Sequence, residues 1–205
     1  MEDVDDGNGN ITQEPVTDAV DIACGNNYTM ILKSDGTVWT TGQNNYGQLG
    51  NGGTQEYYLP RQVLSLSNIV DVAVEENTII AVDKDGYVYA SGYNGYGNLG
   101  DGTTGDKNRF VKVSAIDNVA EVAVSPENST IVLLLDGSVW GFGRNTYNSL
   151  TNVGGAIPQQ LQGPEGALEN ITSIGIGEFT GYAITSEEKV VAWGLNNYSQ
   201  LASGD

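Results

Sequence analysis

Short apolar runs recur along this chain, and each run has the length of a β-strand rather than of a helix. In a first kind of run, apolar residues alternate with other residues, which is the pattern of a strand with one buried face. A second kind follows a few residues later and is rich in β-branched residues. The first runs contain Ile22 and Cys24, Val72 and Val74, Val122 and Val124, and Ile174 and Ile176, and the second span residues 29–32, 78–82, 130–135 and 182–184. No window has a convincing helical period, so the pattern predicts an all-β protein.

A polar, glycine-rich pattern follows each pair of apolar runs. The first three copies have Asp-Gly next, and then a short strand in which Val precedes Trp or Tyr. All four copies continue into a loop that contains Gly, Asn and Tyr and reaches a Leu. The aligned glycines are Gly42, Gly92, Gly143 and Gly194, which are 50, 51 and 51 residues apart. Repeats of this length with strand-like content are typical of propellers and solenoids, in which each copy is one supersecondary unit.

Each copy predicts the same local structure: strand, tight bend, strand, hairpin, strand and loop. Asp-Gly between apolar strands predicts a two-residue type I′ turn, because that turn needs positive φ at both central residues. The glycine column is typical of places where backbones pack closely. The asparagine column predicts left-handed or Asx-type turns and consists of Asn44, Asn94, Asn145 and Asn196.

The repeated residues resemble the regulator of chromosome condensation repeat. Its core reads Asp-Gly-x-Val-Tyr/Trp-x-x-Gly-x-Asn-x-x-Gly-Gln-Leu-Gly, and the first two copies fit it at almost every position. The resemblance covers about residues 18 to 205 and implies a β-propeller in which each repeat is one blade. Seven blades are usual in that family. This chain has four repeats, Tyr28 stands where a His is common, and the later copies lose the terminal glycines.

We therefore expect a β-propeller-like array of four antiparallel blades, forming a partial ring or a small ring. The predicted repeats span about residues 18–66, 67–116, 117–168 and 169–205. Residues 7–16 are similar to the end of a repeat, so the acidic segment 1–17 is predicted to supply the outer strand of a blade. Four blades can close a ring, whereas a partial ring or a segment of a larger propeller would expose blade faces that need a neighbour. In that case self-association through open blade edges is possible.

Charge and composition narrow the range of partners. Eight basic against 26 acidic residues give a net charge of −18, which argues against nucleic acid and against anionic membrane surfaces. No apolar stretch approaches the length of a transmembrane span, so no membrane insertion is expected. The same charge favours solubility and basic or neutral partners. The lone Cys24 is expected to be a small buried apolar residue. The sequence does not identify the compartment, although a secreted or cell-surface location is favoured over the cytoplasm.

Catalytic chemistry has little support in this sequence. The chain has no histidine, which removes the commonest general base and metal ligand, and it has no nucleotide-binding fingerprint. Residues 3–11 have some features of a calcium loop, but the alignment puts Val4 and Pro15 where carboxylates should stand. We therefore predict no enzyme activity, no cofactor and no metal site.

The candidate binding residues are a column of tyrosines in the loop after the third strand of each repeat. They should lie in an arc on one face, and tyrosine is a favoured interface anchor. The alternative is that each ring braces its own loop. The predicted binding residues are Tyr46, Tyr96, Tyr147, Tyr198, Asn45 and Asn197. Two further columns are expected to be structural: Trp39, Tyr89 and Trp140 in the blade core, and Leu49, Leu99, Leu150 and Leu201 between blades.

These features favour a non-enzymatic protein-binding propeller module that presents loops to a protein partner of unknown identity. One alternative is an architectural repeat segment of a large secreted or cell-surface protein. The resemblance implies a further alternative, a guanine-nucleotide exchange factor-like regulator, because relatives include an exchange factor of a small GTPase. Other relatives implied by the resemblance are chromatin-docking domains and a secreted bacterial inhibitor of β-lactamase. The acidic charge argues against docking on nucleosomes or DNA.

Overall fold

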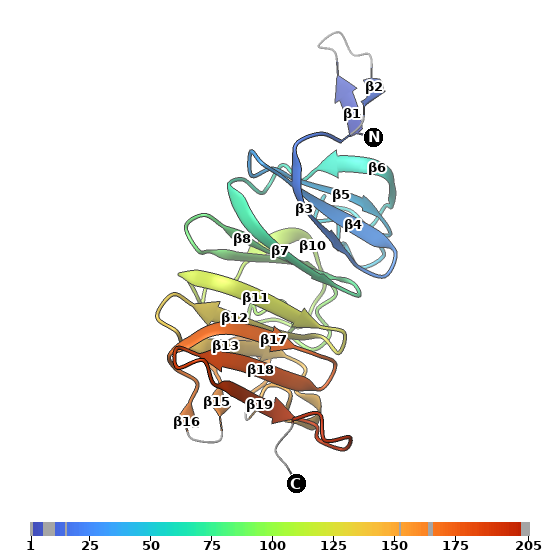
Figure 1. Cartoon of the computed structure of the whole chain (residues 1–205). Helices are drawn as coiled ribbons and strands as arrows, with labels where there is room; N and C mark the ends of the chain where they lie inside the picture. Colours follow the sequence, from blue (N-terminus) through green and yellow to red (C-terminus); the bar gives the residue numbers. More distant parts are fainter. Residues whose placement is uncertain (1, 6–10, 15, 152, 164–165, 202–205) are drawn as a thin grey trace.

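The computed structural model describes residues 2–5, 11–14, 16–151, 153–163 and 166–201 and consists almost entirely of β-strands. Four antiparallel sheets, which we call the first to fourth blades, are stacked one on another from the N-terminal to the C-terminal end (Figure 1). The prediction of an all-β array of four antiparallel blades is therefore confirmed.

The strands of each blade are hydrogen-bonded in sequence order. The first blade contains β3 (Ala19–Cys24), β4 (Tyr28–Lys33), β5 (Val38–Gly42) and β6 (Tyr57–Gln62); the second contains β7 (Ile69–Glu75), β8 (Thr78–Asp83), β9 (Val88–Gly92) and β10 (Lys107–Lys112). The third contains β11 (Val119–Ser125), β12 (Ser129–Leu134), β13 (Val139–Gly143) and β14 (Gly155–Gln160), and the fourth contains β17 (Ile171–Ile176), β18 (Thr180–Thr185) and β19 (Val190–Gly194). Short elements complete the described chain: the hairpins β1 (Glu2–Asp5) with β2 (Ile11–Glu14) and β15 (Gln162–Gly163) with β16 (Gly166–Ala167), and the 3-10 turn η1 (Thr146–Asn148).

The first three blades each have an outer strand that the apolar pattern did not predict. β6, β10 and β14 pair with the third strand of their blade, and each pairing contains a register irregularity. Pro60 and Pro158 lie in two of these strands. Proline is accepted there because an outer strand leaves one row of its N–H groups unpaired.

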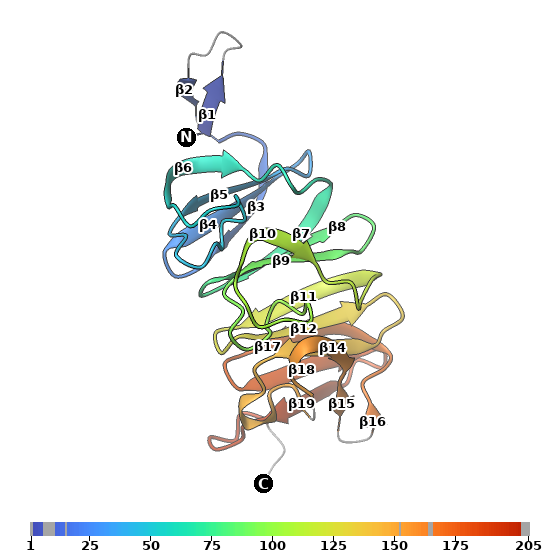
Figure 2. The same ribbon diagram turned by 180° about the vertical axis from the view of Figure 1, so that it is seen from behind.

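The first and fourth blades lie at opposite ends of the stack in both views, so the described chain forms an open arc rather than a small closed ring (Figures 1 and 2). β1 and β2 pair with each other and form a hairpin beyond the first blade, far from β19. The expectation that residues 1–17 supply the outer strand of a blade stays a prediction. Residues 6–10 of the calcium-like segment lie outside the described residues.

The hydrophobic core is divided into three similar clusters, each between two neighbouring blades. Successive residues of β8 show how this arises. Ile79 and Ala81 pack with the first blade, whereas Ile80 and Val82 pack with the third. Because successive side chains of a strand point to opposite faces, a middle blade must be apolar on both faces. Leu49, Leu99 and Leu150 lie fully buried in the three clusters, which confirms the role predicted for them. Leu201 is half-buried and belongs to none of these clusters.

The Asp-Gly hairpins differ from the predicted type I′ turn. Gly36, Gly86 and Gly137 have positive φ, but the preceding aspartates do not. In the first blade the Gly36 N–H donates to the Lys33 carbonyl at 2.9 Å and the Lys33 N–H donates to the Thr37 carbonyl at 3.0 Å. The turn is therefore one residue longer than the predicted two-residue turn. Only the glycine is in the left-handed region, as in hairpins that end in a glycine bulge. The Asp35 carboxylate accepts the Thr37 N–H at 2.9 Å, which is the role of the aspartate.

The prediction of close backbone packing at the glycine column is confirmed. Gly42, Gly92, Gly143 and Gly194 have φ between +98° and +105°. At each of them a Cβ atom would collide with the carbonyl oxygen of the residue that ends the turn between the first two strands, namely Asn27, Asn77, Asn128 and Phe179. Both the backbone angle and the lack of space therefore require glycine.

Two expectations about buried side chains were wrong. Cys24 is exposed, because no blade covers that face of β3 in the described chain. Trp39, Tyr89 and Trp140 are half-buried rather than in the blade core. Tyr89 and Trp140 pack at the margin of two clusters, and the Lys33 ammonium lies 4.5 Å from the Trp39 ring centre.

Replacing Gly92 with Ala should lower the free energy of unfolding by about 3 kcal/mol, because the residue would have to keep a left-handed φ and displace the Asn77 carbonyl. Gly105→Ala is the control, since that position has open space and an ordinary φ. The control should change stability by no more than about 0.5 kcal/mol. Equal effects of the two substitutions on urea unfolding would contradict the steric explanation.

Replacing Leu99 with Ala should lower the free energy of unfolding by about 2–5 kcal/mol, because it leaves a cavity between the second and third blades. The exposed Leu64 offers a matched substitution outside the clusters. If Leu99→Ala were as mild as Leu64→Ala in chemical denaturation, the inter-blade clusters would not be the main source of stability.

Candidate functional site

One side of the stack, which runs along all four blades, carries all the residues predicted to bind a partner. In an antiparallel blade, the turn after the first strand and the loop after the third strand lie at the same edge of the sheet. We call this surface the loop face. It consists of residues 25–27 and 43–47 in the first blade, 76–77 and 93–97 in the second, 126–128 and 144–148 in the third, and 177–179 and 195–199 in the fourth.

The side chains of the asparagine column stabilise these loops by hydrogen bonds to the loop backbone. The side-chain Oδ1 of Asn44 accepts the Leu49 N–H at 2.9 Å, and the side-chain Nδ2 of Asn44 donates to the backbone carbonyls of Gly53 and Gln55. Asn94 makes the same bonds to Leu99, Thr103 and Gly105. These bonds reach five to eleven residues along the chain, and none of the four asparagines has positive φ. The column therefore closes long loops, and the predicted Asx-type or left-handed turns were wrong.

Three of the four predicted tyrosines reach across to the next blade. The Tyr46 ring lies edge-on to Tyr93 with 5.3 Å between ring centres, and Tyr147 lies edge-on to Phe179 at 5.0 Å. The Arg144 guanidinium lies over the Tyr96 ring, 4.8 Å from its centre. Each ring thus bridges two blades rather than bracing only its own loop, and each keeps part of its surface exposed.

The remaining predicted residues are not brought into one site. Tyr198 lies on the fourth blade and is 89% exposed. Asn45 and Asn197 are both exposed, but they lie in the loops of the first and fourth blades, at opposite ends of the arc. The ring contacts of Tyr46, Tyr96 and Tyr147 thus link the four blades in turn rather than forming one compact site.

The sequence analysis missed Tyr93 and Arg144. They follow the aligned glycines directly, at a position occupied by Gln43 in the first repeat and Leu195 in the fourth. Their backbone is nevertheless repeated, because each of the four N–H groups donates to the carbonyl of the residue that ends the neighbouring turn, at 2.9 to 3.0 Å. The signal available in the sequence was a position directly after an invariant glycine at which the four copies carry four different residues.

A shallow hollow lies where the loops of the first three blades meet. Its lining consists of Tyr46, Glu76, Asn77, Tyr93, Tyr96, Pro126, Glu127, Asn128 and Arg144. The Arg144 guanidinium forms an ion pair with Glu127, so the charge that remains on the lining is the carboxylate of Glu76. Burial raises the pKa of Tyr93, and the neighbouring Tyr96 and Asp106 raise it further, which favours the neutral hydroxyl.

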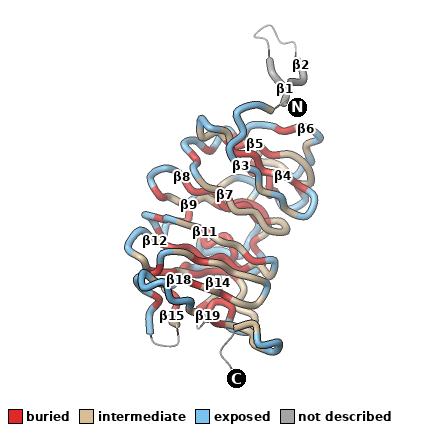
Figure 3. The backbone as a smooth tube through the Cα atoms, in the orientation of Figure 1, coloured by how far each residue is buried: buried red, intermediate tan, exposed pale blue. Residues whose placement is uncertain are grey.

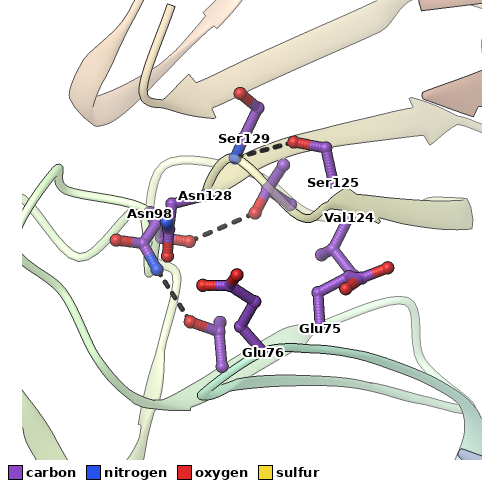
Figure 4. Close-up of a pocket in the computed structure, with 9 residues that line it drawn as sticks. Glu75, Glu76, Asn98, Val124, Ser125, Asn128 and Ser129 are labelled. Atoms are coloured by element: carbon purple, nitrogen blue, oxygen red, sulfur yellow. Dashed lines mark hydrogen bonds between the residues drawn. The ribbon is translucent and has the colours of Figure 1, made fainter. Parts of the chain in front are cut away.

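A second, small cavity lies beneath the loop face between the second and third blades (Figure 4). Glu75 and Asn98 line it from one side and Ser125 and Ser129 from the other. The Asn98 amide donates to the Thr78 hydroxyl at 2.8 Å, and the Ser129 N–H donates to the Ser125 hydroxyl at 3.2 Å. Its volume of about 10 Å³ would hold no ligand larger than a water molecule. This cavity belongs to the blade interface.

Two other kinds of feature are absent from the described part of the chain. Residues 16–151, 153–163 and 166–201 contain no group of three or more Cys, Asp or Glu side chains placed to hold a metal ion. The described elements include no helix with the length and apolar character needed to cross a membrane.

Comparison with protein families identifies the repeats. A model of the regulator of chromosome condensation (RCC1) repeat matches residues 35–82, and a second model of the same repeat matches residues 19–48 and 171–200. The human regulator of chromosome condensation is 26% identical over 184 residues, which cover 90% of this chain and 32% of the human protein. The human E3 ubiquitin-protein ligase HERC2 is 28% identical over 190 residues, covering 90% of this chain and 3% of the ligase.

Solved structures show the same fold. Human WBSCR16 has a TM-score of 0.77 at 21% identity and covers all of this chain, which corresponds to 56% of WBSCR16. Yeast RCC1 (Prp20), in a crystal structure with Kap60, has a TM-score of 0.72 at 19% identity, covering 91% of this chain and 46% of the yeast chain. This chain thus spans about a third of the human regulator of chromosome condensation and about half of these structures. Residues 19–82 and 171–200 thus match regulator of chromosome condensation repeats, and the chain has the fold of β-propeller blades.

Proposed function

We propose that this chain is a non-enzymatic protein-recognition module whose loop face contacts a protein partner. The observation that carries the proposal is the row of tyrosines at equivalent places on successive blades. Tyr46, Tyr96 and Tyr147 each expose part of a ring that the next blade holds in position. Tyr198 extends the row onto the fourth blade.

The properties of these rings suit an interface. A tyrosine supplies a large contact area at low cost in side-chain entropy, and a ring already packed against a neighbour loses less freedom on binding. Between the rings, Gln43, Tyr93, Arg144 and Leu195 occupy one backbone position with four different side chains. A surface with a constant backbone and varied side chains can recognise a specific partner.

Charge favours a basic partner. The chain carries a net charge of −18, and two of the three charged side chains in the hollow, Glu76 and Glu127, are carboxylates. Opposite charge on a partner raises the rate of association and excludes acidic competitors. The exposed part of the Tyr46 ring would also accept a lysine or arginine side chain, as the Tyr96 ring already accepts Arg144.

The similar solved structures are consistent with protein recognition. One contains yeast RCC1 (Prp20) bound to Kap60, and another reports the binding properties of Prp20p from Saccharomyces cerevisiae to Gsp1p and histones. These are partners of the yeast protein. For this chain they support protein binding in general. Which partner it binds depends on the residues of its own loops.

Replacing Tyr46, Tyr93 and Tyr96 together with Ser should weaken partner binding by at least about tenfold, because it removes the aromatic part of the hollow. The experiment compares, by quantitative mass spectrometry, the proteins retained by the immobilised wild-type chain and by the variant. Tyr58→Ser is the control, because Tyr58 is exposed on β6, outside the loop face.

The proposal expects a set of proteins that wild type and Tyr58→Ser retain and that the triple variant loses. Circular dichroism and the melting temperature must show that the triple variant is folded. If the folded triple variant retains the same proteins as wild type, the loop face is not the contact surface. An architectural role or another face would then explain the chain better.

A partner bound through opposite charges should associate more slowly as salt is added, because counterions screen the acidic surface. The association rate of the retained partner should therefore fall steadily with sodium chloride concentration in surface plasmon resonance. Glu76→Gln should reduce that salt dependence, whereas Glu187→Gln, an exposed change on the fourth blade, should leave it nearly unchanged. A rate that rises with salt would contradict recognition of a basic partner.

A further inference from the structure

The first strand of each blade provides one side of the contact with the preceding blade. Val72, Val122 and Ile174 occupy the same position in β7, β11 and β17, and each is only 8% exposed because a neighbouring blade covers it. The equivalent residue of β3 is Ile22, which is 59% exposed. Figure 3 shows β3 as an exposed strand at one end of a stack whose interior is buried.

The fourth blade exposes the other side of the same contact. Leu32, Val82 and Leu133 in the middle strands are buried under the following blade, whereas the equivalent Ile184 in β18 is 44% exposed. The valines that begin the third strands show the same difference. Val38, Val88 and Val139 are fully buried, and the equivalent Val190 in β19 is 69% exposed.

We propose that a second copy of this chain docks the β3 face of its first blade onto the β18–β19 face of the fourth blade. Both halves of this contact are present on every copy. The same contact is already made three times within the chain, through equivalent positions. An association of this kind is heterologous, that is, head-to-tail, and it adds further copies unless the arc closes into a ring.

Backbone and connector residues also fit this docking. Within the chain, the N–H groups of Ile69, Val119 and Ile171 donate to the carbonyls of Gly36, Gly86 and Gly137 in the preceding blade, at 3.0 to 3.1 Å. The equivalent pair between two copies is the Ala19 N–H and the Glu188 carbonyl. Val16 stands where Leu66, Ile116 and Leu168 are buried beside the preceding blade. After docking, Val16 of the second copy would lie beside Val190 of the first copy.

The acidic charge distinguishes self-association from the binding of a basic partner, because salt affects the two in opposite directions. Each copy carries −18, so two copies repel one another at long range, and the apolar faces must overcome this repulsion. Added salt screens the repulsion and should strengthen self-association. The binding of a basic partner to the loop face should change in the opposite direction, so the two interactions can be separated.

The test is the molar mass of the purified 205-residue chain, measured by light scattering after gel filtration over a range of protein concentrations. We expect the wild-type mass to rise above the monomer mass of 21.7 kDa with concentration and with salt. Ile22→Asp should remain monomeric, because it places a charge in the docked face. Val20→Asp is the matched control: Val20 is 62% exposed, and its counterpart Val70 on β7 is still 59% exposed inside the stack.

Mixing two variants tests which faces meet. Ile184→Asp should also be monomeric, but it keeps an intact β3 face, and Ile22→Asp keeps an intact β18–β19 face. An equal mixture should therefore form a dimer that neither variant forms alone. A wild-type chain that stays monomeric at every concentration would overturn the proposal. So would equal behaviour of Ile22→Asp and Val20→Asp, or a mixture that stays monomeric while circular dichroism shows both variants to be folded.

Discussion

The packing of one blade face on the next is the interaction on which the rest of this structure depends. A single three- or four-stranded sheet of this chain cannot bury its apolar side chains by itself, because both faces of a middle blade are apolar. β8 and β12 obtain their burial from two neighbours at once, and the three hydrophobic clusters lie between blades rather than within them. Repeat proteins of this kind derive their stability from contacts between neighbouring units.

The scaffold positions and the surface positions of the repeat have separate tasks. Glycine at 42, 92, 143 and 194 allows the loop to pass close to the neighbouring turn, and the buried Asn44 and Asn94 tie their loops to the return segments. These residues repeat because the same geometry is built four times. Directly beside them, Tyr93 and Arg144 occupy a position where the copies differ. The loop face can therefore vary its chemistry without changing the blade.

The period, the strand content and the leucine and glycine columns could be predicted from the sequence, because each reflects a local requirement that recurs in every copy. Other features depend on what surrounds a residue. Cys24 lies at an alternating strand position, yet it is exposed because its face has no neighbouring blade. The Asp-Gly turns, the reach of the Asn44 amide and the outer strands with Pro60 and Pro158 depend on backbone pairing that apolar periodicity does not describe. Tyr93 was missed because the search followed residues that repeat.

Native-state hydrogen exchange of the backbone amides, in dilute solution where the chain is monomeric, tests the central role of blade packing most directly. The account predicts the slowest exchange in β8 and β12, whose blades are covered on both faces, and faster exchange in β19 at the end of the stack. Protection of β19 equal to that of β8 would contradict it, because stability would then not depend on the number of neighbouring blades.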